Sequence, residues 1–356
     1  MKRAGITFLL LVLVLAVFLR VNYLAGPVTR MEDNAEKKIV YISRGTGTGE
    51  IAEKLHFHGL IFSPLLFNIT CKLTGLDSQL QAGYYELSTR ASMWEQIQTL
   101  TSGQISTFRV TIPEGFTVED VADRLAGLTV LGRDDFIRAA RGKKFEEYFL
   151  PGHPGGGVRY HLEGYIYPDT YVIPRQYEAE EMIEVFLSEF EEKWGDVLAR
   201  RQEESKYTPY EILTIASLVE REARLDREKP LIAGVIFNRL ERDMHLQIDA
   251  SVRYGLRLDR EQVLYRDLEE DNPYNSYMYD GLSPGPIASP GDKAIEAALN
   301  PEETDYLYYF ARENGEHVFS ETYEQHLERQ REELAEEEQQ IETINPAEPL
   351  TEQEED

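Results

Sequence analysis

The longest apolar run of the chain lies at its amino-terminal end. Residues 4–19 are apolar apart from one threonine and one glycine, and after Arg20 the apolar stretch continues to Ala25. An α-helix needs about 20 residues to cross a bilayer, a length that is reached if Arg20 extends its charge to the interface. Lys2 and Arg3 precede the run, so the positive-inside rule keeps the short tip cytoplasmic. The pattern predicts a single-pass transmembrane anchor, with a cleaved signal peptide as the alternative, and either interpretation places the remaining chain outside the cytoplasm.

Two segments of the first half repeat one pattern of apolar positions at an offset of 70 residues. Each has alternating apolar residues that predict a short strand, then a glycine turn, then apolar residues on one face of a helix. With returning strands expected at 83–85 and 164–167 and further helices at 93–100 and 180–190, the pattern predicts two β-α-α-β repeats. Chance convergence of a common strand-turn-helix pattern is the alternative. The matched positions are Val40/Val110, Ile42/Ile112, Gly45/Gly115, Ile51/Val121, Ala52/Ala122 and Leu55/Leu125.

A strong helix signal begins at Thr208. This threonine suits the N-cap, the proline after it suits the first helical position, and Glu211 completes a capping box. Apolar residues then recur along one stripe of the helix predicted over 212–223. Because a helix turns by about 100° per residue, Glu220 and Glu222 lie on the two edges of that stripe.

Glu220 is the candidate catalytic group of this helix. Partial cover by apolar neighbours favours the protonated form of a carboxyl group, which a general acid requires. The spacing also fits an ordinary surface ion pair between Glu220 and Arg224 at i,i+4. Position on the helix alone leaves both interpretations open.

Further along the chain, the spacing predicts a second helix over 229–239 and a short extended arm that leads into a helix, over 244–255. If the arm is extended, Gln247 and Asp249 point to the same side. The last strands are expected at 306–311 and 317–319.

The stretch 272–291 holds four prolines, three glycines and three tyrosines. This composition excludes a helix or an inner strand and predicts an ordered loop. Tyrosine rings and amides, here including Tyr274 and Asn275, suit a sugar-binding groove, because pyranose faces stack on rings and hydroxyls need hydrogen bonds. A loop that only covers the core fits the composition equally well.

Composition narrows the classes of function. Among 356 residues there are 37 Lys and Arg and 64 Asp and Glu, so the formal net charge is −27, which argues against a nucleic-acid partner. Cys71 is the single cysteine, so the chain can form neither an internal disulfide nor a cysteine-rich zinc site. The closest of the seven histidines, His56 and His58, lack an obvious third ligand. We therefore expect no metal and no cofactor.

The carboxyl-terminal segment 331–356 carries 11 acidic residues and one basic residue. It is typical of a solvated, disordered tail. The predicted fold class is α+β. The expected domains are a cytoplasmic tip and transmembrane helix (1–25), a linker (26–37), the first β-α-α-β repeat with its following helix (38–107), an α+β domain that starts with the second repeat (108–330) and the tail (331–356).

Two resemblances add to this picture. The first repeat, roughly residues 38–88, resembles a LysM module, a binder of N-acetylglucosamine polymers. The chain up to about residue 330 resembles the endolytic murein transglycosylase family. The stretches that carry the second resemblance are LEGYIYPDTY at 162–171, IASLVERE at 215–222, LQ-x-D at 246–249, and YNSY at 274–277 leading into GLSPGPI at 281–287. Ala250 and Ser283 stand where the family often has proline, and the acidic tail lies outside the family's pattern.

The resemblance implies a lyase that cuts the β-1,4 bond between N-acetylmuramic acid and N-acetylglucosamine in nascent peptidoglycan strands. Cleavage leaves a 1,6-anhydromuramic end and terminates strand growth. The implied partners are glycan strands, the bacterial inner membrane and membrane-bound synthases. By this resemblance Glu220 is the catalytic acid and base, Gln247, Asp249, Tyr274 and Asn275 are candidate substrate-binding residues, Glu163 and Asp169 support the site, and Glu222 is structural.

One carboxyl group suffices for such a reaction, whereas ordinary glycosidases need two. Protonated Glu220 would donate to the leaving O4, the substrate's 2-acetamido group would stabilise the cation, and the C6 hydroxyl would then attack C1 as it gives its proton to Glu220. Two alternatives stay open. One is an anchored muramidase that uses water, with Asp249 as its second carboxylate. The other is a non-catalytic scaffold that binds glycan through the first repeat and recruits synthases.

Overall fold

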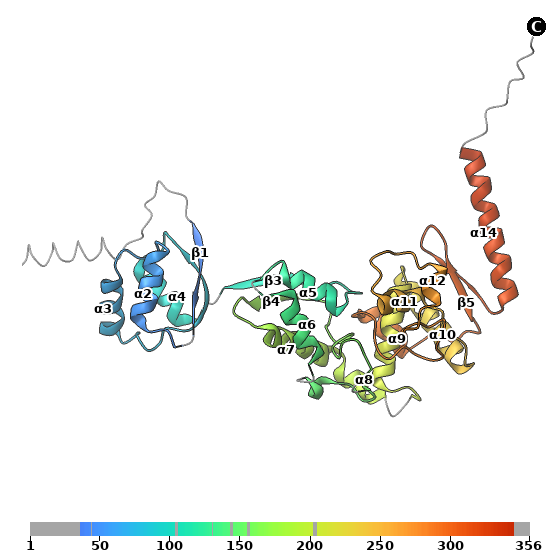
Figure 1. The fold of residues 1–356 in the computed structure, drawn as a ribbon, viewed down its shortest axis with the longest axis horizontal. Helices are drawn as coiled ribbons and strands as arrows, with labels where there is room; N and C mark the ends of the chain where they lie inside the picture. Colours follow the sequence, from blue (N-terminus) through green and yellow to red (C-terminus); the bar gives the residue numbers. More distant parts are fainter. Residues whose placement is uncertain are drawn as a thin grey trace, which may run out of the picture. The chain divides into compact units, whose positions relative to one another are not determined.

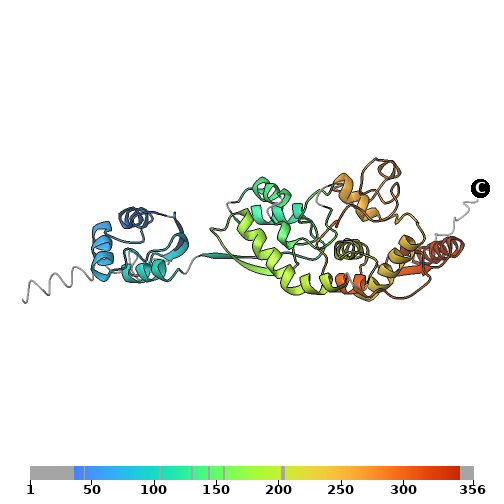
Figure 2. The same cartoon turned by 90° about the horizontal axis from the view of Figure 1, so that it is seen from below.

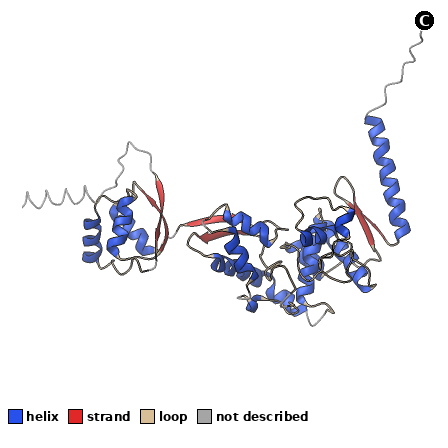
Figure 3. Ribbon diagram, in the orientation of Figure 1, coloured by secondary structure: helices blue, strands red, loops and turns tan. Residues whose placement is uncertain are grey.

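The computed structural model describes residues 36–344 apart from 44, 104–105, 130, 143–144, 155–156 and 202–204. The expected membrane anchor at 1–25 and most of the expected linker at 26–37 lie outside the described residues. Within the described part, no helix has both the length and the apolar character needed to span a bilayer. Helices and two-stranded sheets alternate along the chain (Figures 1 and 3), so the predicted α+β class is confirmed.

The chain divides into two compact units, each with its own packing. Of the described residues, the amino-terminal unit comprises those from 36 to 110 together with 171–178, and the carboxy-terminal unit comprises those from 111 to 170 and from 179 to 344. The elements before the boundary are β1 (Lys37–Ile42), α2 (Thr48–Phe57), α3 (Pro64–Thr74), β2 (Gly83–Ser88) and α4 (Met93–Ser102), and the paired strands β3 (Thr107–Thr111) and β4 (Thr170–Pro174) run across it.

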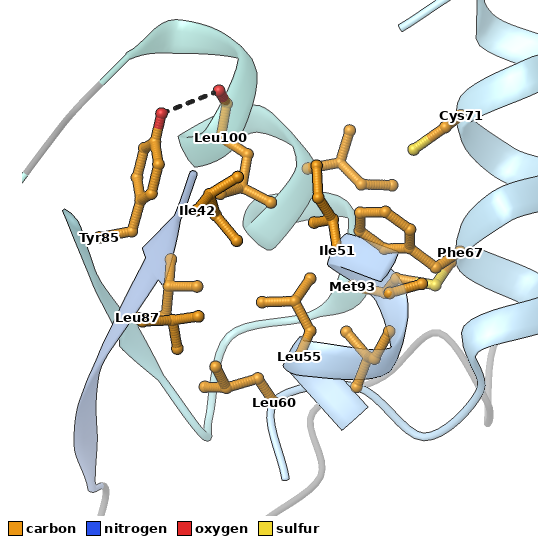
Figure 4. Packing of buried hydrophobic residues seen from close by; sticks show 14 residues of the cluster. Ile42, Ile51, Leu55, Leu60, Phe67, Cys71, Tyr85, Leu87, Met93 and Leu100 are labelled. Carbon is orange, nitrogen blue, oxygen red and sulfur yellow. Dashed lines mark hydrogen bonds between the residues drawn. The ribbon is translucent and has the colours of Figure 1, made fainter. Parts of the chain in front are cut away.

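The first repeat folds in the predicted order, β1-α2-α3-β2, and α4 follows it. The two strands pair antiparallel, with Val40 opposite Tyr85. Both side chains, together with Ile42 and Leu87, are buried in a core that α2, α3 and α4 complete (Figure 4). The Tyr85 hydroxyl donates a hydrogen bond to the carbonyl oxygen of Leu100 at 3.4 Å (Figure 4). Alternate apolar positions in the strands and a one-sided apolar face on each helix are therefore enough to specify this core.

The second repeat keeps the order of its elements but not the predicted position of its last strand. Helices α5 (Val118–Ala126) and α6 (Arg133–Arg141) lie between β3 and β4 in the chain. Residues 164–167, predicted to be the returning strand, form a turn in which every residue is buried. Gly164 has a φ of +86°, and a Cβ at this position would lie 2.7 Å from the side chain of Pro286. The prediction was wrong because the aromatic residues are buried on all sides of a turn rather than on one face of a strand.

Helix α9 (Pro209–Glu222) is the central helix of the carboxy-terminal unit (Figure 2). Its capping box is present as predicted, since Thr208 Oγ1 accepts from the Glu211 amide at 3.2 Å and Glu211 Oε2 accepts from the Thr208 amide at 2.7 Å. The helix packs against α10 (Lys229–Glu241), α11 (Asp249–Leu256) and α13 (Asp292–Leu299). Residues 212–219 are all buried, on every side of the helix, and the residues after Val219, at the carboxyl end, are partly or fully exposed.

The remaining elements surround α9 or follow it. No helix or strand lies between α12 and α13, so the loop predicted over 272–291 is confirmed, as are the last two strands. The elements not yet given are η1 (Glu146–Tyr148), α7 (Ala179–Phe190), the π-helical turn η2 (Glu191–Gly195), α8 (Asp196–Arg201), η3 (Asp226–Glu228), α12 (Tyr265–Leu268), β5 (Tyr308–Ala311), β6 (His317–Ser320) and α14 (Tyr323–Ile344).

The beginning of the acidic tail differs from the prediction. Residues 331–344 continue helix α14 rather than forming a disordered segment. Glutamate, glutamine, leucine and alanine are good helix formers, and the first proline of the tail is Pro346. An ion pair of 2.7 Å joins Glu333 of the helix to Arg312, the residue that follows strand β5. Helix propensity and this contact outweigh the repulsion between the acidic side chains.

Candidate active site

The carboxyl end of α9 places Glu220 at a partly covered position, where its side chain is 10% exposed. Its Oε2 atom accepts two contacts of 3.2 Å, one from the Lys229 ammonium and one from the backbone amide of Gly291. Among the described residues, none donates a hydrogen bond to the other oxygen, Oε1. One oxygen therefore fixes the orientation of the carboxyl group, and the other is available to a ligand.

The lysine beside Glu220 is itself held in place. The side chain of Lys229 is 4% exposed, and its ammonium also lies 3.0 Å from Oδ1 of Asp226. Burial alone would lower the pKa of Lys229, but the carboxylates of Glu220 and Asp226 raise it above its usual value. Lys229 thus stays charged and provides a fixed positive charge for the Glu220 carboxylate.

A second carboxyl group, Glu114, lies close to the first. Partial burial raises the pKa of Glu114, and the negative charge of Glu220 raises it further, although the residue as a whole is exposed. A Cβ placed on Gly291 would be 1.9 Å from Oε1 of Glu114, so Gly291 lies against both Glu114 and Glu220. The negative charge of Glu220 thus favours the protonated form of Glu114. In the described part of the chain, no three His, Cys, Asp or Glu side chains lie close enough together to bind a metal ion.

Backbone contacts hold the turn of the second repeat next to the end of α9. The amide of Gly115 donates to the carbonyl oxygen of Ser289 at 2.8 Å, and the amide of Ser289 donates to that of Phe116 at 2.7 Å. The Arg221 guanidinium also donates to the Gly115 carbonyl oxygen at 3.0 Å. The turn that contains Glu114 is in this way joined both to the 272–291 loop and to α9.

Sequence analysis missed Glu114, Lys229 and Gly291. The glycine turn at Gly115 was recognised, but the acidic residue before it was not connected with Glu220, which lies 106 positions later. Lys229 was considered only as the start of a helix. The arrangement depends on three segments that meet in space, and spacing within a single segment carries no information about it.

The other acidic residue of α9 has different neighbours. The Tyr309 hydroxyl donates to Oε2 of Glu222 at 2.9 Å. Burial raises the pKa of Glu222 to about 7, and the charge of Asp249 contributes to the rise. Asp249 in turn accepts a hydrogen bond of 2.7 Å from the Tyr277 hydroxyl. The predicted structural residue Glu222 is therefore a titratable carboxyl group in a network of its own.

The predicted groove residues fall into two groups. Gln247 and Asp249 are exposed and lie on the Glu222 side, where Gln247 Oε1 contacts Arg239 at 3.5 Å. Tyr274 and Asn275 are instead buried. The Tyr274 hydroxyl accepts from the Arg159 amide at 3.3 Å. A substrate contact by Gln247 or Asp249 stays a prediction.

The polar atoms of Asn275 are used within its own loop. Its side-chain amide donates to the carbonyl oxygens of Leu268 and Glu270 at 3.0 and 2.9 Å, and its Oδ1 accepts from the Tyr277 amide at 3.0 Å. With 1% exposure, Asn275 holds the loop together. Substrate contacts by Tyr274 and Asn275 stay a prediction.

The two predicted supports of the site differ in burial. Glu163 is 2% exposed, and its carboxyl group accepts from the Val118 amide at 3.0 Å and from the Tyr254 hydroxyl at 2.8 Å. Burial raises the pKa of Glu163 to about 8. Asp169 is exposed and accepts from the Thr170 amide at 2.6 Å. Glu163 thus connects the start of α5 with α11, while Asp169 orders the start of β4.

Comparison with known proteins places this arrangement in a family. A family model described as the YceG-like family matches residues 40–332. The chain belongs to the YceG-like family. Its curated relatives include the endolytic murein transglycosylase of Bacillus subtilis (strain 168), which is 33% identical over 81% of this chain and 82% of the relative. Another is the endolytic murein transglycosylase of Streptococcus pneumoniae serotype 2 (strain D39), which is 30% identical over 82% of this chain and 57% of the relative.

A solved structure from the same YceG-like group has the same fold. The crystal structure of a yceG-like protein from Listeria monocytogenes matches with a TM-score of 0.58 and 31% identity, over 83% of this chain and 99% of that chain. The YceG-like segment 40–332 contains the first repeat, Glu114, α9 and the 272–291 loop. The arrangement around Glu220 is therefore built entirely from residues within the family segment.

Proposed function

We propose that this YceG-like chain is an endolytic peptidoglycan lytic transglycosylase that uses Glu220 as both acid and base. The observation that carries the proposal is the environment of Glu220, whose Oε2 is anchored while Oε1 lacks a described partner. A fixed carboxyl group with one available oxygen is suited to proton transfer. The names of the Bacillus and Streptococcus relatives support glycan strands of peptidoglycan as the substrate.

In the proposed reaction, protonated Glu220 gives its proton to O4 of N-acetylglucosamine as the bond from that oxygen to C1 of N-acetylmuramic acid breaks. The resulting carboxylate then takes the proton of the C6 hydroxyl group, whose oxygen bonds to C1. Glu220 ends in the protonated form in which it began, and no water, metal or cofactor takes part. The products are a free O4 hydroxyl and a 1,6-anhydromuramic end, so strand growth at that end stops.

The neighbours of Glu220 fit the two halves of this cycle. The Lys229 ammonium, 3.2 Å from Oε2, stabilises the carboxylate that exists between the two proton transfers. Glu114, whose pKa is raised by burial and by the negative charge of Glu220, places a second carboxyl group, one that favours its protonated form, beside Glu220.

The proposal extends to the rest of the chain. The first repeat acts as a LysM-like glycan-binding module, supported by its β-α-α-β order and antiparallel strand pair. The apolar run at 4–25 supports a single-pass anchor in the bacterial inner membrane, with the described residues outside the cytoplasm. An anchored enzyme of this kind meets new strands where membrane-bound synthases make them, and we propose these synthases as partners.

The test is digestion of purified glycan strands by the wild-type chain and by Glu220→Gln, with product ends identified by mass spectrometry. Glu296→Gln, at an exposed ion pair with Lys293, is the matched control, and thermal melting verifies that each variant is folded. We expect anhydro ends from the wild type and the control and none from Glu220→Gln.

Each alternative gives a different result. Ends that are heavier by one water would show the water-dependent muramidase. Strands left intact by the folded wild-type chain, but bound by it, would show the non-catalytic scaffold. Undiminished cleavage by Glu220→Gln would show that Glu220 is not the catalytic acid and base.

A further inference from the structure

A pocket of about 410 Å³ in the carboxy-terminal unit is lined by five arginines. They come from α6, α9, α11, the residue that follows α11 and the loop between η1 and β4, and the acidic part of the wall comes from α5 and from Asp259. A concentration of guanidinium groups is unexpected in a chain with a net charge of −27. The arginines are Arg133, Arg159, Arg221, Arg253 and Arg257.

Two of the five arginines have carboxylate partners in the wall of the pocket. Arg133 lies 2.6 Å from Oδ1 of Asp123 and 3.5 Å from Oε2 of Glu119. Arg257 lies 3.2 Å from Oε1 of Glu119. The carboxylates of Glu119 and Asp123 thus balance the charges of Arg133 and Arg257. We regard this side of the pocket as structural.

The other three make no ion pair with a described residue. Arg159 donates to the carbonyl oxygen of Gly255 at 2.5 Å and lies over the Tyr254 ring, with 4.4 Å from its guanidinium carbon to the ring centre. Arg221 donates to the Gly115 carbonyl oxygen. For Arg253, the buried Nε atom has no hydrogen-bond partner in the described structure.

Three guanidinium groups without a described carboxylate partner leave positive charge around one pocket, which favours an anionic ligand. A planar guanidinium group matches a carboxylate with two parallel hydrogen bonds. The pocket therefore has the charge and the donor geometry for a carboxylate-bearing group.

The position of the pocket narrows the identity of this ligand. A Cβ on Gly115 would lie 3.5 Å from Arg221 Nη1 and 4.0 Å from Cγ of Glu220, so the pocket wall and Glu220 share a neighbour. In peptidoglycan, the sugar whose C1 is attacked carries a stem peptide with free carboxylates. We propose that the pocket binds a carboxylate of this stem peptide and that Arg253 is its main contact. The inference rests on the proposed function, because it takes its ligand from the proposed substrate.

The test compares native glycan strands with strands whose peptide carboxyl groups have been converted to amides. This change removes the charge and keeps the size. Because charge-assisted hydrogen bonds are strong, we expect the wild type to cleave native strands with a kcat/KM about 10 to 100 times higher. Arg253→Gln should lower kcat/KM on native strands by a similar factor and leave it unchanged on amidated strands, and Arg253→Lys should retain part of the preference.

Arg138→Gln is the matched control, because Arg138 is 75% exposed and its ion pair in the described part of the chain is with Asp135 on the same helix, α6. It should cleave both kinds of strand as the wild type does. Equal cleavage of native and amidated strands by the wild type would overturn the inference, as would an equal loss on both strands in Arg253→Gln. Either result leaves the proposed function intact if anhydro ends still form, whereas absence of anhydro ends in every digest would refute the proposed function itself.

Discussion

Glu220 and Glu222 lie two residues apart at the end of one helix, yet the two sides of α9 give them different chemistry. Glu220 has a lysine and a backbone amide on one oxygen and a second carboxyl group, Glu114, nearby. Glu222 has the Tyr309 hydroxyl and the charge of Asp249, and burial raises its pKa to about 7. Identical side chains on the same helix can therefore differ in role because their neighbours come from different segments.

The two sides of α9 differ in the groups that contact the carboxyl group of each glutamate. On the Glu220 side a permanent cation stabilises a carboxylate, so the group can lose and regain a proton during a reaction. On the Glu222 side the Tyr309 hydroxyl donates to a carboxyl group whose pKa burial raises to about 7. The first arrangement suits a catalytic acid and base, and the second suits a carboxyl group that supports the packing of α9 against β5.

The strongest test of this comparison is Glu220→Gln. An amide retains the size of the side chain but cannot donate the proton, so we expect cleavage of glycan strands to fall by about 10²- to 10⁴-fold. The measurement is the rate constant of cleavage under single-turnover conditions. Strand binding is measured separately, so that a slower chemical step can be told from weaker binding. A loss confined to binding would contradict the assignment.

The next largest effect is expected for Gly291→Ala. A Cβ would lie 1.9 Å from Oε1 of Glu114, so Glu114 or the amide that holds Glu220 must move. Because a misplacement of about 1 Å can cost 10²-fold in rate, we expect a loss of about that size, measured as kcat. Gly47→Ala is the control, since a Cβ there meets no atom within 4 Å. Wild-type activity in Gly291→Ala would show that the site tolerates displacement of the Glu114 side chain and would contradict a part for Glu114 in the reaction.

Glu222→Gln should have a smaller effect. Glutamine keeps the hydrogen bond to Tyr309 and resembles the protonated carboxyl group, so we expect kcat/KM to fall by less than about tenfold. The measurement is a pH profile of kcat/KM for the variant and the wild type. If Glu222→Gln loses as much activity as Glu220→Gln, Glu222 is also needed for the reaction, and the assignment of different roles to the two glutamates is wrong.

The smallest effect concerns stability and pH. The pKa values of Glu222 and Glu163 are raised to about 7 and about 8 in the folded chain. Between the ordinary value of 4.5 and these values, the folded chain holds protons that the unfolded chain has released, so the free energy of unfolding falls as pH rises. Thermal melting should show a transition temperature a few degrees higher at pH 5 than at pH 8.

The double variant Glu163→Gln/Glu222→Gln is the control for this trend. Glutamine does not titrate, so the difference in transition temperature between the two pH values should shrink. If the transition temperature of the double variant still differs as much between the two pH values, groups other than Glu163 and Glu222 cause the pH dependence.

Local sequence pattern was sufficient for the elements that depend on neighbours in the chain. The strands and helices of the first repeat, the capping box at Thr208 and the proline-rich loop before α13 all follow from periodicity and capping chemistry. The turn at 164–167 did not, because a buried turn and an inner strand share the same apolar composition. Helix α14 likewise extends into the tail because helix-forming residues continue past 331.

Only the part of the site that depends on a single residue, Glu220, could be predicted from the sequence. Glu220 could be proposed from its place on a helix and from a family resemblance. Glu114, Lys229 and Gly291 could not, because their importance arises when three distant segments meet. Burial of Tyr274 and Asn275 also depends on packing that the sequence pattern of the loop does not contain.

The most direct test of the central claim is to run the reaction in water enriched in heavy oxygen and to measure the label in the new glycan ends. If Glu220 regains its proton from the C6 hydroxyl group as that oxygen attacks C1, the anhydro ends of the wild-type digest carry no heavy oxygen. Incorporation of one heavy oxygen atom per cleaved bond would show that water attacks C1, and the account of Glu220 as the single acid and base of an intramolecular transfer would be wrong.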